Sequence, residues 1–268
     1  MGITNNLHRE LAPITDGAWA EIEEEARRTF KRNVAGRRVV DVVGPQGLEL
    51  AAVGTGHLET IAAPADGVQA RLRTARPIVE LRVPFSVTRD AVDDVERGSQ
   101  DSDWDPVKAA AKTIALNEDR AIFEGYPAAR ITGIKEASEH AAGNLPGDPL
   151  LAPNALAQAL STLRLAGVDG PYSILLDAEA FTAVSETSDH GYPIKEHLRR
   201  LINGEIVWAP GVDGAVVLST RGGDFAMHIG QDLAIGYHSH DAQNIELYLT
   251  ESLTFAVYSA EAAVTLTR

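Results

Sequence analysis

Two histidines and a short acidic run carry the residue types that metal sites need. His238 and His240 stand two apart, so on a strand both imidazoles would point to one face and could meet one ion. Such a site needs further ligands, and a polar turn between strands is the competing interpretation. Residues 101–105 resemble the start of a calcium loop, but Pro106 and Lys112 stand where glycine and glutamate are required. Helix capping explains these acids better, and we predict no metal site.

The patterns of catalytic and nucleotide sites are incomplete. Ser185, Asp189 and His190 have the side chains of a hydrolase triad, but a triad is defined by geometry, and no Gly-x-Ser-x-Gly turn is present. Residues 54–56 lack the third glycine of a dinucleotide fingerprint. The chain has no cysteine, which excludes thiolate nucleophiles and disulfides. We therefore expect a protein without catalytic residues, and a hydrolase or a secreted antibacterial protein is the alternative.

Charge and composition limit the classes of partner that the chain could bind and the cellular compartment in which we expect it. The net charge of -14 predicts repulsion from nucleic acid and from anionic membranes, although basic residues cluster between positions 27 and 38. The single Arg-Gly-Gly at residues 221–223 fits a tight turn better than an RNA contact. No stretch approaches the ~18 apolar residues of a membrane helix, and the N-terminal residues lack the pattern of a secretion signal. We expect a cytoplasmic protein that contacts neither membrane nor nucleic acid.

Two helices must form the framework of the fold. Trp19, Ile22, Ala26, Phe30 and Val34 recur at spacings of three or four, which predicts one buried stripe on a helix that begins near residues 15–16. A second helix should begin at residues 105–106, with aspartate as N-cap and proline as the first helical residue, and run to residue 123. The segment between them, residues 48–83, has short strand-like pieces and few large apolar side chains. It should be ordered best by pairing with another subunit.

The remaining segments mix helices and strands without regular alternation, which predicts an α+β class. Loops are expected at residues 133–153 and 187–193. Helices are expected at residues 155–166, 178–186 and 194–202. Strands are expected at residues 38–43, 172–176, 206–208, 215–219, 225–229, 233–237, 243–258 and 262–266.

Eight ordered strings give the chain a resemblance to the encapsulins, the family also called linocin-type bacteriocins. Two of them read DDVERG, at residues 93–98, and EDRAIFEGY, at residues 118–126. The others lie at residues 5–13, 36–42, 167–172, 219–225, 230–237 and 251–255. One string alone is weak, but the ordered set covers nearly the whole chain and is most similar to actinobacterial members. It implies a structural shell protein; a true phage capsid protein is a weaker possibility.

The resemblance implies the fold of the tailed-phage major capsid protein. Its parts are a peripheral domain with a long spine helix, an extended loop and an axial domain. We expect residues 1–43 to form the N-terminal luminal helix and the start of the peripheral domain, and residues 44–80 the extended loop. Residues 81–130 would then carry the spine helix, residues 131–224 the axial domain and residues 225–268 the last peripheral strands.

The resemblance also implies where the shell binds its partners. The chain would assemble with about sixty copies of itself into an icosahedral nanocompartment. Its cargo would be a dye-decolorising peroxidase or a ferritin-like protein, which implies a role in oxidative stress or iron storage. The C-terminal peptide of that cargo would lie in a luminal groove, whose matching positions are Phe30, Val34, Arg37, Asp232, Ile235 and Tyr237.

A pore and a cofactor are the two further points of comparison. The loop that would line the five-fold pore contains Ser188, Asp189, His190, Gly191 and Tyr192, and its histidine suggests a pore that responds to pH. Some members bind flavin through a tryptophan just before the Asp-Glu-Arg-Gly region. Residues 88–91 contain no aromatic side chain here, so we expect no cofactor.

Overall fold

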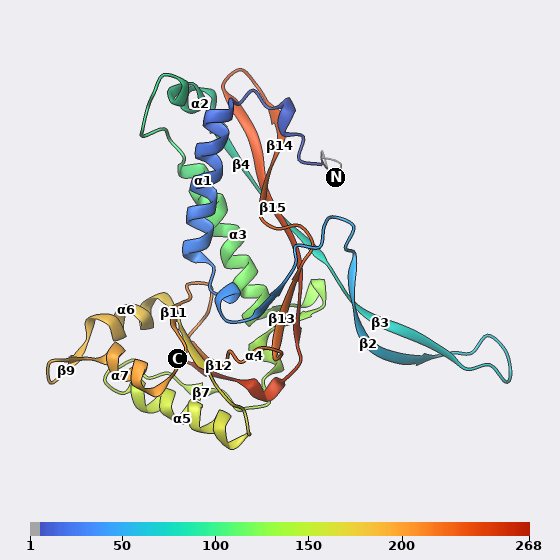
Figure 1. Cartoon of the computed structure of the whole chain (residues 1–268), viewed down its shortest axis with the longest axis vertical. Coiled ribbons are helices and arrows are strands. Elements are labelled where there is room, and N and C mark those ends of the chain that lie inside the picture. The colour runs from blue at the N-terminus through green and yellow to red at the C-terminus, as the bar shows by residue number, and fades with distance from the viewer. Residues whose placement is uncertain (1–5) are drawn as a thin grey trace.

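The computed structural model describes residues 6–268 and is organised around one long strand, β15 (Asn244–Val257) (Figure 1). Strand β4 (Val79–Thr88) pairs antiparallel with ten residues of it. Strand β14 (Ala234–His240) also pairs with β15, and β13 (Phe225–Ile229) pairs with its C-terminal part. Strand β1 (Asp41–Val43) adds to β13 in parallel. Residues 1–5 of the expected first segment lie outside the described residues, and so does residue 5, the first residue of the first resemblance string.

Two long helices cover this sheet side by side, α1 (Asp16–Asn33) and α3 (Asp105–Phe123). Helix α1 begins where the sequence predicted, because the hydroxyl of Thr15 accepts a hydrogen bond from the Ala18 N–H. The predicted apolar stripe of α1 is buried against α3 and the sheet. Helix α3 has 19 residues, so it spans about 28 Å and forms the spine of this half of the molecule.

The second half of the molecule surrounds a mixed sheet with the strand order β11-β8-β12-β16-β7. All five residues of β8 (Tyr172–Leu176) and of β12 (Ala215–Ser219) are buried, as expected for central strands. The flanking strands are β11 (Ile206–Trp208), β16 (Ala263–Thr267) and β7 (Gly143–Asn144). The sheet packs with helices α5 (Ala152–Leu165), α6 (Ala178–Glu186) and α7 (Ile194–Leu201).

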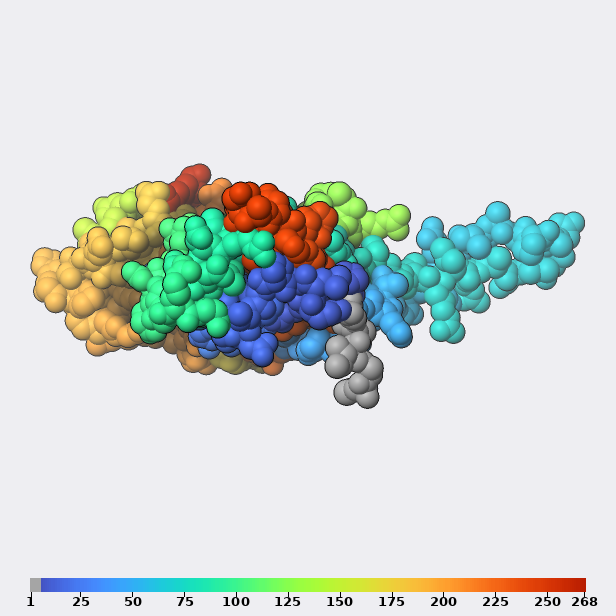
Figure 2. Space-filling model, turned by 90° about the horizontal axis from the view of Figure 1, so that it is seen from above, coloured from blue at the N-terminus to red at the C-terminus, as the bar shows by residue number. Residues whose placement is uncertain are grey.

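An arm of two strands projects away from both halves (Figures 1 and 2). Strands β2 (Ala52–Ile61) and β3 (Ala70–Pro77) pair only with each other. Large apolar side chains on the arm face solvent, with Leu58 53% and Leu72 54% exposed. A lone two-stranded ribbon is at best marginally stable in water. The arm therefore fits the sequence-based expectation that this segment needs a partner outside its own chain.

Several predicted boundaries are wrong. Residues 36–38 form a 3-10 turn, η2 (Gly36–Arg38), in place of the start of a strand. Gly36 has to approach α3 closely here, because a Cβ on it would lie 2.5 Å from the side chain of Ile122. Helix α3 begins at Asp105 itself, with Trp104 as its N-cap and no side-chain cap. Asp105 instead pairs with Lys108 at 2.8 Å.

Shorter elements were missed or misplaced. Helix α2 (Arg89–Glu96) was not predicted, although Thr88 caps it through the Ala91 N–H. The expected loop at residues 133–153 contains α4 (Ile134–Ala137) and β7, and α5 begins three residues early. The expected pore loop is a small hairpin of β9 (Ser188–Asp189) and β10 (Tyr192–Pro193). The other short elements are η1 (Arg9–Leu11), β5 (Gly125–Tyr126), η3 (Pro127–Ala129), β6 (Ile131–Thr132) and η4 (Ala260–Ala262).

Candidate functional site

A groove of about 700 Å³ lies between helix α1 and the start of strand β14, and we call it the α1–β14 groove. Five of the six residues expected to bind a cargo peptide line it: Phe30, Val34, Arg37, Asp232 and Ile235. They come from segments about 200 residues apart in the sequence. Packing of α1 against the sheet brings these segments together, since Phe30, Val34 and Ile235 lie in one buried cluster with Leu249, which also lines the groove.

The floor of the groove is apolar and belongs to the core. Phe30, Val34 and Ile235 are each more than nine-tenths buried and pack in the cluster that joins α1, α3 and the sheet. The sequence left open whether Phe30 and Val34 are core residues or binding residues. In the structure they are both, because their buried side chains form the core and their remaining surface faces the groove.

Charged side chains stand at both ends of the groove. At one end Arg9 pairs with Glu23 at 2.5 Å, and its guanidinium lies 4.2 Å from the centre of the Trp19 ring. At the other end Arg37 pairs with Asp232 at 2.7 Å. The lining also includes three further cations, Arg27, Lys31 and Arg38. The groove thus has an apolar floor and a rim in which positive charge predominates.

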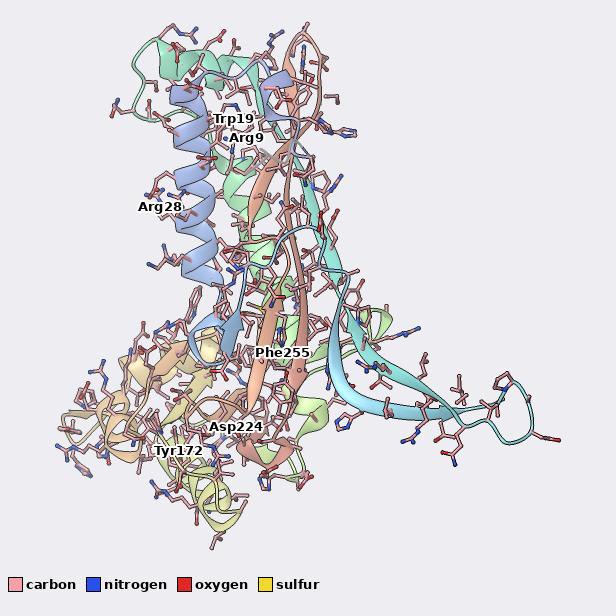
Figure 3. All side chains as sticks on the ribbon, turned by 45° about the vertical axis from the view of Figure 1, so that its right-hand side comes forward. Arg9, Trp19, Arg28, Tyr172, Asp224 and Phe255 are labelled. Carbon is pink, nitrogen blue, oxygen red and sulfur yellow. The ribbon has the colours of Figure 1, made fainter. Side chains whose placement is uncertain are left out.

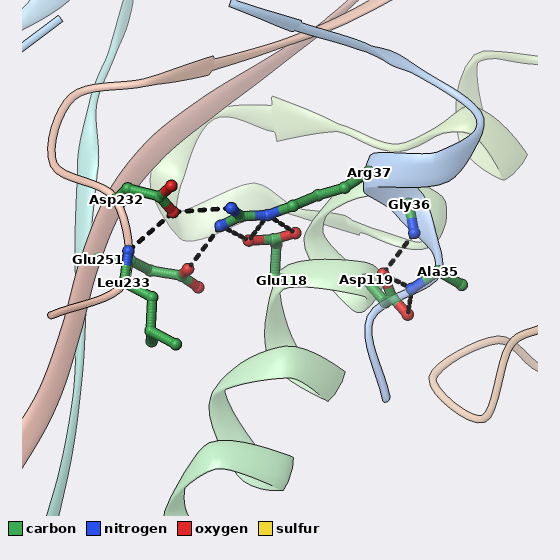
Figure 4. A network of polar contacts seen from close by, with 8 residues as sticks. All are labelled: Ala35, Gly36, Arg37, Glu118, Asp119, Asp232, Leu233 and Glu251. Atoms are coloured by element: carbon green, nitrogen blue, oxygen red, sulfur yellow. Dashed lines mark hydrogen bonds and ion pairs between the residues drawn. The ribbon is translucent and has the colours of Figure 1, made fainter. Parts of the chain in front are cut away.

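Arg37 is held by a cluster of three carboxylates (Figure 4). Its Nε and Nη2 atoms donate to Glu118, and Nη2 also donates to Glu251 at 3.2 Å. Glu118 and Glu251 are buried, whereas Asp232 is half exposed at the groove. Burial, and next the nearby charge of Glu118, raise the pKa of Glu251 well above its ordinary value. The cluster fastens the turn after α1 to the spine helix and to β15.

The neighbouring carboxylate, Asp119, fastens the same turn through the backbone. Its oxygens accept hydrogen bonds from the N–H groups of Ala35 and Gly36 at 2.8–3.0 Å (Figure 4). Burial raises the pKa of Asp119 to about 7, although these two N–H bonds favour its charged form. Two consecutive residues of α3, Glu118 and Asp119, therefore position one wall of the groove.

Tyr237, the sixth expected cargo-binding residue, does not line the groove. Its backbone N–H donates to the Leu7 carbonyl at 2.8 Å, and its hydroxyl lies 2.7 Å from Nδ1 of His240. The segment before η1 therefore contacts this part of β14.

The five expected pore residues lie together in the β9–β10 hairpin, at the far end of the second half of the molecule. His190 and Gly191 form its tip, both with positive φ, and the His190 side chain is 98% exposed. Tyr192 anchors the hairpin: its ring meets that of His197 edge-on at 4.8 Å, and Arg200 lies over it. The tip is exposed and its base is packed.

The other candidate ligands do not converge. The register of β14 shifts between Tyr237 and Ser239, and Nδ1 of His240 lies 2.7 Å from the Tyr237 hydroxyl. Among residues 6–268 no group of three side chains is placed to hold a metal ion. The same residues include no helix that is long and apolar enough to cross a membrane.

Sequence reasoning missed several residues of the groove. Glu23 and Arg27 lie seven and three positions before Phe30, so the helical period places them on its face. Arg9 belongs to the first resemblance string and could have been included. Leu233 lies in the resemblance string at residues 230–237 and could also have been included, whereas Leu249 carried no such signal, because only its pairing opposite Ile235 places it at the groove.

The spine helix, the projecting arm and the second half built on its own sheet define a subunit with the capsid fold of tailed phages. Solved structures bear this out. The virus-like particle of Pyrococcus furiosus aligns with a TM-score of 0.65 at 16% identity, covering 92% of this chain and 98% of that one. The capsid of Myoviridae phage XM1 aligns with a TM-score of 0.54 at 13% identity, covering 85% and 89%.

The sequence comparisons narrow this class to one family. Residues 4–254 match the family described as an encapsulating protein for peroxidase. The type 1 encapsulin shell protein of Rhodococcus erythropolis is 64% identical over 261 residues, 97% of this chain and 99% of that protein. The one from Mycobacterium tuberculosis is 63% identical over 262 residues, 98% and 99%. The chain belongs to this family of encapsulin shell proteins, which are structural proteins rather than enzymes and assemble into shells of many subunits.

Proposed function

We propose that the shell formed by this chain encloses cargo enzymes by binding their C-terminal peptides in the α1–β14 groove. The observation that supports this is the combination of an apolar floor with charged ends, Arg9 with Glu23 and Arg37 with Asp232. An extended tail with apolar side chains would bury them on Phe30, Val34 and Ile235. The family description and the resemblance favour a dye-decolorising peroxidase or a ferritin-like protein as cargo.

Many copies of a weak site suffice for such a role. A short disordered tail loses conformational entropy when it binds, so each contact is expected to be weak. In a shell of about sixty copies, an oligomeric cargo can engage several grooves at once, which raises the overall affinity without any new contact. We infer that one groove in each subunit acts in this way.

The β9–β10 hairpin is proposed to line the pore at the five-fold axis. Its exposed tip carries Asp189 and His190, whose side chains lie 3.6 Å apart. Five copies would form a ring of these polar groups around a narrow opening. If so, small-ion entry should change in shells with both Asp189→Ala and His190→Ala, and unchanged entry would contradict the pore assignment.

One experiment tests the cargo proposal on intact shells. Electron microscopy of the purified protein should show uniform hollow spheres. A fluorescent peptide with the C-terminal sequence of a candidate cargo, a dye-decolorising peroxidase, should bind them in a polarisation assay. Leu233→Asp, which places a charge in the groove lining, should abolish that binding, and Leu165→Asp, on the exposed surface of α5, should leave it unchanged. Intact Leu233→Asp shells that bind the peptide normally would refute the proposal.

A further inference from the structure

A second groove, of about 610 Å³, runs along the opposite side of α1, between α1 and α3, and we call it the basic groove. Trp208, the last residue of β11, also lines it. Its charged lining residues are Glu25, Arg28, Arg32, Lys108 and Lys112. Figure 3 shows Arg28 extending from the side of α1 that faces away from Arg9. The basic groove is therefore separate from the α1–β14 groove.

The charge of the basic groove is not balanced within the subunit. Glu25, its one acid, pairs with Arg28, and Lys108 pairs with Asp105 at 2.8 Å. Arg32 and Lys112 make no ion pair within residues 6–268, and both are exposed. A local surplus of positive charge in a chain of net charge -14 indicates an anionic partner.

The helix dipoles do not account for these cations. Arg32 lies in the last turn of α1, where a positive charge is favoured, but Lys108 and Lys112 lie in the first half of α3, where it is not. Arg28 and Arg32 are also four residues apart on one helix, as Lys108 and Lys112 are on the other. Like charges at that spacing repel each other. An anion with several charges, bound between the two helices, would relieve both repulsions.

Trp208 adds an aromatic surface to the groove. Its side chain is half-buried, and within residues 6–268 its indole N–H has no hydrogen-bond partner. A planar base can stack on an indole ring, and arginine and lysine bind phosphate oxygens. We propose that the basic groove binds a nucleoside polyphosphate, with its phosphate chain between Arg32 and Lys112 and its base against Trp208.

The proposed contacts of the phosphate chain are tested by calorimetry, in which adenosine triphosphate is added to purified shells without divalent metal. The double variant Arg32→Gln, Lys112→Gln should bind roughly tenfold more weakly or worse, because two charge-assisted contacts are lost. Arg27→Gln, Lys31→Gln is the matched control. It also removes two positive charges, but from the side of α1 that faces the α1–β14 groove. It should bind like the parent. Equal binding by the Arg32→Gln, Lys112→Gln shells would overturn the proposal.

The proposed contact between the base and Trp208 is tested with inorganic tripolyphosphate, which has no base, as the second probe. Trp208→Leu should weaken adenosine triphosphate binding roughly tenfold and leave tripolyphosphate binding unchanged, and Trp208→Phe should restore most of the loss. Adenosine triphosphate should quench the fluorescence of parent shells, because Trp19 and Trp104 are buried and Trp208 is not. Equal affinity of both probes for parent shells would refute the base contact. Binding only to dissociated subunits would show instead that this surface is a contact between copies.

Discussion

Arg37 and Glu118 form a two-point ion pair, in which Nε donates to Oε1 at 2.9 Å and Nη2 donates to Oε2 at 2.6 Å. The pair joins the turn after α1 to the last third of the spine helix, and Glu118 is fully buried. The same guanidinium contacts Asp232 at the edge of the α1–β14 groove. Arg37 is therefore a residue of the groove and of the framework at once, and the two roles can be separated by substitution.

The first prediction compares the two buried glutamates. Glu118→Gln should destabilise the subunit by about 3 kcal/mol, the lower end of the range for breaking a buried pair, because Asp232 and Glu251 still face Arg37. Glu251→Gln should cost less than Glu118→Gln, because burial and the charge of Glu118 raise the pKa of Glu251 and already disfavour its charged form. Heat-induced unfolding followed by tryptophan fluorescence measures both. Equal losses would show that Glu251 is charged in the native protein.

The second prediction concerns pH and Asp119. Its pKa is about 7 in the folded chain against an ordinary 3.8, so the folded chain binds the proton more tightly than the unfolded chain. The associated stability is present below about pH 4 and is lost as the pH rises to about 7, by up to roughly 4 kcal/mol. Asp119→Asn should make this decrease smaller, and the remainder should come from Glu251, which has the same sign.

The control for this prediction is the double variant Asp119→Asn, Glu251→Gln. Its unfolding temperature should no longer decrease between pH 4 and 7, since both carboxyl groups with raised pKa values are then replaced by amides, and the lowered pKa of His228 acts in the opposite direction. A parent protein whose stability instead increases across this range would contradict the assignment. Asp119→Asn keeps one oxygen, and because the Ala35 and Gly36 N–H groups both reach Oδ1, at 3.0 and 2.8 Å, that oxygen can accept both bonds.

The two long helices and most strands were predictable because each is specified locally. The stripe from Trp19 to Phe30 follows a period that only a helix satisfies, and Tyr172–Leu176 is a continuous apolar run. Helix α2 escaped prediction because it has only eight residues, two of them buried. The strand expected at residues 38–43 begins only at Asp41, because residues 36–38 form a turn whose conformation depends on Asp119, more than 80 residues away.

The α1–β14 groove was predictable only in part, because it too depends on contacts between segments that are distant in the sequence. The helical period placed Phe30 and Val34 on one face, whereas Asp232 and Ile235 came from the resemblance. Tyr237 was also expected in the groove from the resemblance alone. The Tyr237 N–H instead donates a hydrogen bond to the carbonyl of Leu7. No sequence periodicity could predict this contact between positions 7 and 237.

The third prediction concerns the projecting arm. Leu58→Ser with Leu72→Ser should leave the fold of the isolated subunit unchanged, because both side chains are already exposed in it. It should weaken assembly, because these side chains are expected to become buried against another copy. Sedimentation velocity measures the fraction of protein in shells. Leu150→Ser with Leu165→Ser, two exposed leucines of the second half, is the control. Normal assembly of the arm variant would show that the arm's apolar side chains do not hold the shell together.

The last prediction concerns the anchor of the β9–β10 hairpin. Tyr192 packs edge-on against His197 and under Arg200, whereas the His190 side chain at the tip is 98% exposed. Tyr192→Ala removes an aromatic pair that contributes about 1 kcal/mol, so the hairpin should open several-fold more often. Hydrogen exchange of residues 187–193 should then be several-fold faster in assembled shells, with β8 unaffected.

Tyr126→Ala is the control for this measurement, because Tyr126 is an exposed tyrosine remote from the hairpin. It should leave the exchange of residues 187–193 unchanged. If Tyr192→Ala gave the same exchange as the parent, the anchor would have to be the backbone instead: the Ile194 N–H donates to the Thr187 carbonyl at 3.0 Å and joins the two ends of the hairpin. Faster exchange together with faster ion entry would link the mobility of this hairpin to the permeability of the shell.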